Sequence, residues 1–306
     1  MIFIRDKHFN INQKTVVTFG KFDGIHKGHR KLFAKAREIA DKENLLLVAF
    51  AFKVVSGCRF GYMENEQITT SDERADIFEN LGVDVIVEYP FDEETAQTEP
   101  LTFLENVIKN MLNAAYVVVG SDWNFGKDRA GNTDVLKASQ KLYNFTAVVM
   151  DKELYQGKEV SSTWIREEIR NGNMENVNIL LDYPYTVNGT VEHGNHIGTG
   201  MGFPTINIVP CPNKLLPPRG VYASKVLIDG ETYYGVTNIG VKPTVSEEEQ
   251  LTIETYIIGF DKDAYKEKLK VQLFHFQRPE MKFNDIATLA NQINQDVEFT
   301  KSYFMI

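Results

Sequence analysis

The spacing of apolar residues changes near the middle of the chain, and this change constrains the fold more than any other feature. In the first half, short apolar runs alternate with longer segments of helical pattern. The runs, rich in β-branched and aromatic residues, are VVTFG, LLLVAFAF, VDVIVEY, AAYVVVG and FTAVVM. Continuous apolar runs are typical of strands buried on both faces. Strands alternating with helices predict a doubly wound parallel sheet from Val16 to about Asp151.

The segments between these runs support this interpretation. One helical stripe after the first run collects Leu32, Phe33, Ala36, Ile39 and Ala40. The segment SDERADIFENLG has a helix start at Ser71 and a stop at Gly82. In doubly wound sheets, ligands bind beyond the carboxyl ends of strands. The unusual residues do follow strands: residues 20 to 29 follow the first, Lys53 begins the loop after the second, and GSDWNFG follows the fourth.

After Tyr183 the pattern becomes one of short strands with turn residues and no intervening long helices. This pattern predicts an antiparallel β-barrel or sandwich. A final amphipathic helix is expected, with a stripe of Ile286, Leu289, Ala290, Ile293 and Val297. We expect the domain boundary near Pro184, with an N-terminal domain at 1–183 and a C-terminal domain at 184–306. Two domains also fit the length of 306 residues.

Composition excludes several classes of partner. The net charge of −9 argues against a general nucleic-acid or acidic-membrane binder, because phosphate backbones are held by positive surface charge. Cys58 and Cys211 match no zinc or redox spacing, which suits a reducing cytoplasm. The charged start lacks the apolar core of a signal peptide, and no apolar run is long enough to cross a bilayer. We therefore expect a cytoplasmic protein with no nucleic-acid or membrane partner, of unknown oligomeric state.

The segment VVTFGKFDGIHKGHRKLF predicts an anion site. A strand ending at Phe19 and a helix beginning near His26 direct the free amides of the helix at the intervening turn, and such amides favour phosphate. His26 and His29, three residues apart, project from the same side of the helix. The alternatives are solvated or helix-capping histidines, or a zinc pair with Asp23 as the third ligand. The coincidence of strand end, glycines and helix start favours the anion site.

This segment also carries a family resemblance. GKFDGIHKGH resembles the nucleotide-binding motif of nucleotidylyltransferases, and VSSTWIREEIR resembles the second motif of that superfamily. The resemblance implies that His26 and His29 stabilise the α-phosphate of ATP during adenylyl transfer. The nucleotide-binding residues that it implies are Gly20, Phe22, Asp23, Gly28, Ser161, Ser162, Thr163 and Arg166. Taken alone, the second motif would be interpreted as a helix N-cap with an ordinary basic residue.

In the second half, GTGMGFPTINI is by itself either a mobile loop entering a strand or a phosphate-binding turn. Thr205 and Asn207 add oxygens that can reach magnesium. The segments that follow, PNKLLPPRGVYA, GVTNIGVKPTV, LTIETYIIGF and FQRPEMKF, resemble the riboflavin kinase domain in the same order. From residue 15 to residue 300, the chain is similar to the bacterial bifunctional riboflavin kinase/FMN adenylyltransferase (FAD synthetase) family.

The resemblance implies two reactions: riboflavin and ATP give FMN, and FMN and ATP then give FAD and pyrophosphate, with Mg²⁺ as cofactor. Glu254 would be the kinase general base, and alternation along its strand sets it on the face opposite Ile253 and Thr255. A solvated edge carboxylate is the alternative. The implied nucleotide-binding residues of the kinase are Gly198, Gly200, Gly202, Pro204, Thr205 and Asn207, of which Thr205 and Asn207 hold the metal.

Flavin contacts are implied in both halves. In the first they are Asp122, Trp123 and Phe125, where the tryptophan replaces a phenylalanine and keeps a flat face for stacking. In the kinase half they are Arg278 and Glu280, with a plain surface arginine as the alternative for Arg278. The chain departs from the family at AFAFKVVSGCRF, where a Pro-containing segment is usual. The alternatives are that only one activity is retained, or that the chain is a flavin-binding regulator without catalysis.

Overall fold

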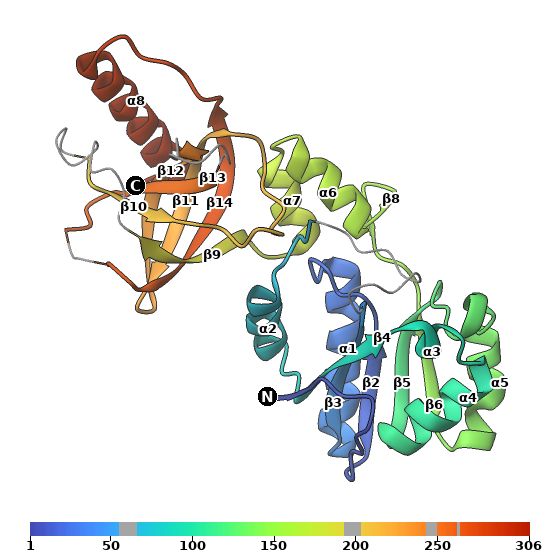
Figure 1. The fold of residues 1–306 in the computed structure, drawn as a ribbon. Coiled ribbons are helices and arrows are strands. Elements are labelled where there is room, and N and C mark those ends of the chain that lie inside the picture. Colours follow the sequence, from blue (N-terminus) through green and yellow to red (C-terminus); the bar gives the residue numbers. More distant parts are fainter. Residues whose placement is uncertain (55–65, 193–202, 243–249, 262–263) are drawn as a thin grey trace. The chain divides into compact units, whose positions relative to one another are not determined.

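The computed structural model describes residues 1–54, 66–192, 203–242, 250–261 and 264–306 (Figure 1). Contacts divide the chain into two compact units. The α/β unit comprises Met1–Asn65 and Arg74–Ser161, and the barrel unit comprises Glu66–Glu73 and Ser162–Ile306. None of the helices in these described ranges is long and apolar enough to span a membrane.

The α/β unit is built on a six-stranded sheet in which all neighbouring strands are parallel. The strand order is β1 (Ile2–Ile4), β4 (Val85–Phe91), β3 (Leu46–Val54), β2 (Thr15–Phe19), β5 (Ala114–Gly120) and β6 (Thr146–Met150). The chain winds outward from β2 through β3 to β4, and then crosses to β5 on the other side of β2. The winding therefore reverses between β2 and β5, and the expected doubly wound sheet is confirmed. The edge strand β1 was not predicted.

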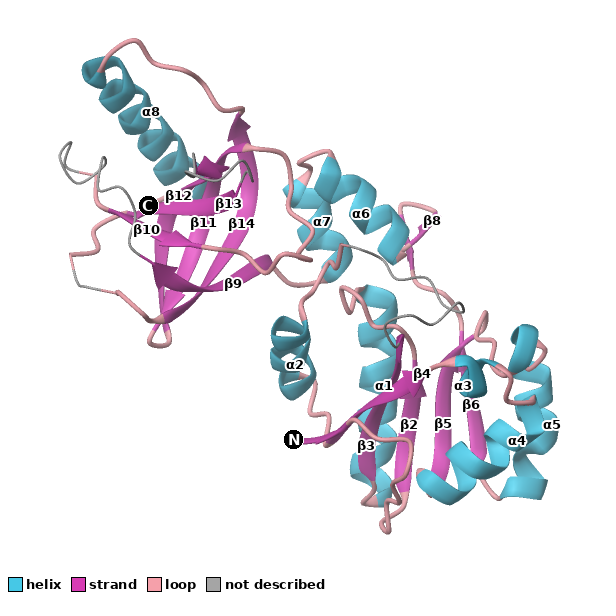
Figure 2. Cartoon of the chain, in the orientation of Figure 1, coloured by secondary structure: helices cyan, strands magenta, loops and turns pink. Residues whose placement is uncertain are grey.

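Helices cover both faces of this sheet (Figure 2). They are α1 (Lys27–Glu43), α2 (Ser71–Asn80), α3 (Glu93–Ala96), α4 (Pro100–Phe103) with the π-helix η1 (Leu104–Met111), the 3₁₀ turn η2 (Lys127–Arg129) and α5 (Thr133–Tyr143). A short hairpin, β7 (Leu154–Tyr155) and β8 (Lys158–Glu159), completes the unit. On β2, Val16 packs with α1 on one face, while Val17 packs with η1 on the other. Burial on both faces explains the continuous apolar runs.

The barrel unit contains a closed antiparallel barrel, which confirms the barrel and not the sandwich. Its strand order is β10 (Thr205–Ile208), β13 (Gln250–Ile257), β12 (Glu231–Lys242), β11 (Gly220–Ile228), β14 (Lys268–Arg278) and β9 (Tyr185–Glu192). The terminal helix α8 (Ile286–Phe304) packs Val297 against Val221 and Val236. Ile286, expected on its buried stripe, is 68% exposed because it is the first residue of the helix.

Contacts group α6 (Ser162–Arg170) and α7 (Met174–Leu181) with the barrel, although both precede Pro184. The boundary between residues 183 and 184 stays a prediction. Residues 66–73 also belong to the barrel unit, although the chain on both sides of them belongs to the α/β unit.

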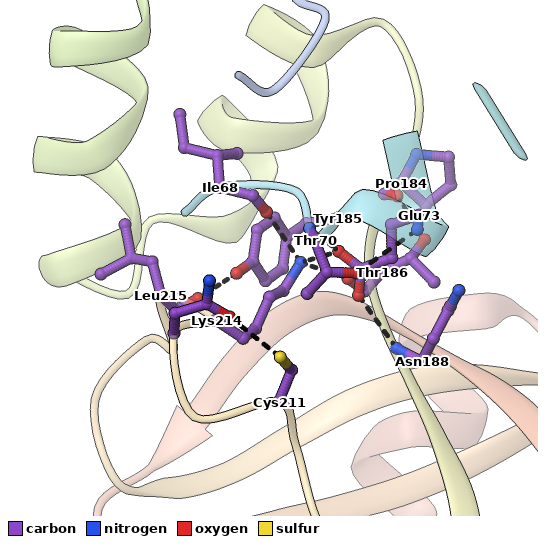
Figure 3. A network of polar contacts seen from close by, with 11 residues as sticks. Ile68, Thr70, Glu73, Pro184, Tyr185, Thr186, Asn188, Cys211, Lys214 and Leu215 are labelled. Carbon is purple, nitrogen blue, oxygen red and sulfur yellow. Dashed lines mark hydrogen bonds and ion pairs between the residues drawn. The ribbon is translucent and has the colours of Figure 1, made fainter. Parts of the chain in front are cut away.

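A buried polar network holds residues 66–73 in the barrel unit (Figure 3). Lys214 Nζ lies 2.7 Å from Glu73 Oε2 and donates to the backbone oxygens of Ile68 and Thr186, each at 2.7 Å. Glu73 Oε1 accepts from the backbone N–H of Asn188 at 3.0 Å. Glu73 also closes a capping box with Thr70, since each side chain accepts from the other residue's backbone N–H. The first turn of α2 is therefore fixed by groups of the barrel unit.

Candidate active sites

The turn between β2 and α1 is anchored in the core of the α/β unit. Phe22 and Ile25 are fully buried and adopt positive φ angles of 51° and 31°, which residues other than glycine rarely adopt. Gly20 is required here because a Cβ at this position would lie 2.7 Å from the Phe22 ring. Packing of Phe22 and Ile25 therefore supports a strained turn at the carboxyl end of β2. The turn lies beside the point where the winding of the sheet reverses.

The two histidines are held at the end of this turn. His26 is the N-cap residue of α1 and is buried, and its ring stacks on that of His29 with centroids 3.9 Å apart. Its side chain makes no capping hydrogen bond, so the capping alternative is wrong. The Nδ1 atoms of both rings are buried and have no hydrogen-bond partner within the described parts of the chain, which argues against solvated side chains.

Burial keeps both rings neutral. It lowers the pKa of His26 from 6.5 to about 4. The pKa of His29 is lowered well below 6.5, first by burial and then by repulsion from His26. A neutral imidazole carries one N–H donor, and an anion bound here would favour a second proton. No acidic residue lies in the first turn of α1, so its free amides add to this preference for an anion.

The zinc alternative finds no support. Asp23 is buried in the same turn, yet no group of three His, Cys, Asp or Glu side chains that could hold a metal occurs among the residues described. Gly28 belongs to the histidine site, because a Cβ there would lie 3.2 Å from the His26 ring. A side chain at this position would press on the imidazole. The stacked pair fits an anion better than a metal.

The second motif opens helix α6. Ser162 and Thr163 stand in its first turn, and Arg166 is buried one turn later on the same face as Ser162. Ser161 belongs to the α/β unit, and the other three residues belong to the barrel unit. That these residues share one site with the histidines stays a prediction.

The loop after β5 presents an aromatic surface. The half-buried Trp123 stacks on the buried Phe125, with centroids 4.5 Å apart and planes 21° apart, and also contacts Phe19. Asp122 is exposed and pairs with Lys152 at 3.1 Å. Phe125 pairs through its backbone with Gly131 and packs in the core, so Trp123 offers the accessible face. A flat ring at the carboxyl end of a strand suits the predicted flavin contact.

In the barrel, the register brings the predicted kinase residues together. Asn207 of β10 is directly opposite Glu254 of β13, and Thr205 shares a face with Asn207. Asn207 is buried, and its Oδ1 has no hydrogen-bond partner among the described residues. An unpartnered carbonyl oxygen fits a hard cation such as Mg²⁺, which takes oxygen ligands. Pro204 is exposed at the entry to β10, and Gly198, Gly200 and Gly202 lie outside the described residues.

The two residues assigned to the flavin end of the kinase differ in their surroundings. Arg278 donates from Nε and Nη2 to the two carboxylate oxygens of the buried Asp296 on α8, at 2.9 and 2.6 Å. This pair ties α8 to the barrel, and a flavin contact of Arg278 stays a prediction. The Glu280 carboxylate fills the space beside Gly240, where a Cβ would overlap its Oε1.

One side chain beside Glu254 was not predicted from the sequence. Asn238 of β12 is directly opposite Glu254, on the side away from Asn207. The segment GVTNIG predicts a strand, but strand pairing cannot be read from it. No sequence signal would have connected Asn238 with Glu254.

Comparisons with known proteins agree with this geometry. The FAD synthetase family model matches residues 8–164, and the riboflavin kinase model matches residues 181–304. A bifunctional riboflavin kinase/FMN adenylyltransferase from Listeria monocytogenes is 34% identical over 98% of this chain and 95% of its own length. The protein of the same name from Escherichia coli is 31% identical over 94% of this chain and 92% of its own.

A solved structure has the same architecture throughout. A Streptococcus pneumoniae protein described as a macrolide-efflux protein matches with a TM-score of 0.88 and 29% identity, over 98% of this chain and 99% of that one. The fold and the two candidate sites thus define a class of protein in which a nucleotidylyltransferase unit precedes a kinase barrel. The chain belongs to the bifunctional riboflavin kinase/FMN adenylyltransferase family.

Proposed function

We propose that the chain makes FAD in two steps, phosphorylating riboflavin to FMN in the barrel unit and adenylylating FMN in the α/β unit. The substrates are riboflavin, FMN and ATP, with Mg²⁺ as cofactor, and the proposed location is the cytoplasm. One observation carries the proposal. In each unit, buried polar atoms where phosphate chemistry is expected have no hydrogen-bond partner among the described residues: the imidazole Nδ1 atoms in the α/β unit and Asn207 Oδ1 in the barrel unit.

Adenylylation needs positioning and charge stabilisation without a covalent intermediate. A phosphate oxygen of FMN attacks the α-phosphorus of ATP, and the bond to pyrophosphate breaks. The attacking phosphate is already anionic, so no general base is required. His26 and His29 donate hydrogen bonds to the α-phosphate oxygens, whose charge grows in the transition state. Because both imidazoles are buried in fixed positions, their donors need little reorganisation during the reaction.

Riboflavin phosphorylation does require a base. Glu254 accepts the proton of the 5′-hydroxyl as that oxygen attacks the γ-phosphorus of ATP, and ADP leaves. Thr205 and Asn207 would hold Mg²⁺ through their side-chain oxygens, and the ion supplies neutralisation of the phosphate charge when bound.

The test is chromatographic separation of FMN and FAD after incubation with riboflavin, ATP and MgCl₂, in air and under anaerobic conditions. His29→Ala should lower FAD formation about a hundredfold or more while FMN formation continues. Glu254→Gln should remove FMN formation and leave the conversion of supplied FMN to FAD intact. If both variants form both products at wild-type rates, the site assignments fail. If the wild-type chain forms neither product with either flavin redox state, a regulator without catalysis is supported instead.

A further inference from the structure

A lysine begins the helix that carries the two histidines. Lys27 is the first residue of α1, directly follows the N-cap His26 and is half-buried. Side chains of an α-helix lean toward its N-terminus, so the Lys27 side chain is directed back toward the turn where the free amides also point. A cation in this position is unfavourable without a ligand, because the N-terminus of a helix is itself positive. Such departures from a local rule are expected at functional sites.

A hairpin packs against this first turn of α1 within the α/β unit. Lys27 Nζ lies over the ring of Tyr155 in β7, 5.4 Å from its centroid. Glu153, just before β7, lies beside Gly28, since a Cβ on that glycine would be 3.8 Å from the Glu153 Cβ. The Glu153 carboxylate pairs with Lys31 at 3.0 Å, one turn further along α1. The β7–β8 hairpin therefore fixes the surroundings of the Lys27 ammonium group.

The charge of Lys27 is not used by this packing. Lys31 is neutralised by Glu153, whereas no ion pair of Lys27 occurs among the residues that the structure describes. The face of an aromatic ring attracts an ammonium group but does not cancel its charge. Tyr155 thus orients the Lys27 ammonium group while its positive charge stays uncompensated beside the histidine site. An uncompensated cation at this position suits an anionic part of the substrate.

The course of the hairpin indicates which anionic part this is. Tyr155 pairs with Lys158 across the hairpin, and the chain then reaches Ser161, the first residue of the second nucleotide-binding motif. With the α-phosphate of ATP at the histidines, the nucleoside lies on one side of it and the β- and γ-phosphates on the other. The nucleoside carries no charge, so a cation on the way to the second motif fits the outer phosphates.

We propose that Lys27 binds the outer phosphates of ATP and stabilises pyrophosphate as it leaves, while the ring of Tyr155 positions its ammonium group. As an FMN phosphate oxygen attacks the α-phosphorus, the bond from that phosphorus to the bridging oxygen breaks, and its electron pair stays on pyrophosphate. The Lys27 ammonium group neutralises part of this growing charge. The inference rests on the proposed adenylylation and adds to it a residue for the leaving group.

The experiment measures FAD formation by the full chain from supplied FMN, ATP and MgCl₂, with pyrophosphate and AMP as separate inhibitors. Lys27→Met removes the charge and keeps an unbranched side chain. It should lower kcat/KM for ATP and raise the inhibition constant of pyrophosphate, each about tenfold, because a charge-assisted contact is lost. The inhibition constant of AMP, which lacks the outer phosphates, and the KM of FMN should not change. Lys27→Arg should restore most of the loss, since a guanidinium group keeps the charge and stacks on aromatic rings.

The role of Tyr155 is tested by two variants. Tyr155→Phe keeps the ring face and should match the wild type, whereas Tyr155→Leu removes the ring and should raise the inhibition constant of pyrophosphate about threefold. Equal losses in both variants would show that the ring face does not position Lys27.

The control is Lys35→Met, the same change two turns along α1, where the lysine is paired with Glu38 at the surface; it should match the wild type. If Lys27→Met behaves like this control, Lys27 is only a solvated lysine. Equal weakening of pyrophosphate and AMP inhibition, or a change confined to the KM of FMN, would also overturn the assignment to the outer phosphates. If the wild-type chain forms no FAD from FMN, the proposed function of the α/β unit fails, and the role of Lys27 fails with it.

Discussion

The Lys214–Glu73 pair gives the most quantitative prediction. Only 1% of the Lys214 side chain and 4% of the Glu73 side chain are exposed, and the two atoms are 2.7 Å apart. Lys214→Met removes the ammonium group and its contacts with Glu73 and with the backbone oxygens of Ile68 and Thr186, while keeping an unbranched apolar side chain (Figure 3). Within the described residues, Glu73 then remains as a buried carboxylate whose hydrogen-bond donors are the backbone N–H groups of Thr70 and Asn188.

Breaking a buried ion pair by removing one partner costs about 3–5 kcal/mol, because the remaining charge is left uncompensated. The two N–H groups that still donate to Glu73 place the expected loss near the lower end, at about 3 kcal/mol. With a urea m-value of about 2 kcal/mol/M, the midpoint of unfolding of the barrel unit should fall by about 1.5 M. The double variant Glu73→Leu/Lys214→Met should recover part of this loss, since it buries no charge.

The chain offers a local reporter for this assay. It has two tryptophans, of which Trp164 lies buried in α6 of the barrel unit. In a Trp123→Phe background, urea unfolding followed by tryptophan fluorescence reports on that unit. Arg170→Met is the matched control, because its pair with Glu66 is about half-exposed on both sides and should contribute less than about 1 kcal/mol. A shift for Lys214→Met no larger than that of Arg170→Met would refute the reasoning.

Three further predictions follow from the same contacts. Because the folded-state pKa of His26 is about 4, below the unfolded value of 6.5, the unfolded state binds the proton more readily, and stability falls as pH drops through this range. At pH 5 the part of this loss that comes from His26 should be about 2 kcal/mol in urea unfolding, and His26→Gln should remove that part while the part from His29 remains. Gly28→Ala should lower FAD formation about tenfold by displacing the His26 ring, with FMN formation as the unchanged control. Asp296→Asn should destabilise the barrel unit by about 1.5–3 kcal/mol by weakening the paired contact to Arg278, while a thermal melt equal to wild type would contradict this.

Local sequence patterns were sufficient to predict much of the fold. The apolar run that contains Val16 and Val17 predicted a strand buried on both faces, and the sheet confirms it. The change of pattern after Tyr183 predicted an antiparallel barrel or sandwich, and the structure is a closed barrel. The buried stripe predicted for α8 is confirmed at Val297, which is buried, and wrong at Ile286, which is exposed. Periodicity does not show at which residue a helix begins to contact its neighbour. The site residues stay predictions until the variants are measured.

Pairing between distant segments could not be predicted in the same way. Glu73 lies in the first turn of the helix predicted from Ser71, and nothing in its segment indicates that it meets a lysine 141 positions away. The position of Asn238 beside Glu254 depends on strand register, which the turns and the whole barrel set together. The stacking of His26 on His29 also depends on the burial of Phe22 and Ile25 beneath their turn.

The sequence by itself determined the two fold classes, the motifs and the family, because helical and strand periodicities and glycine-rich turns are properties of short segments. Only the tertiary structure decided the surroundings of the functional groups. Those surroundings are the burial that keeps the histidines neutral, the register that sets amides on both sides of Glu254, and the inclusion of residues 66–73 in the barrel unit. Each arises from contacts between segments far apart in the chain, whose energies no local pattern records.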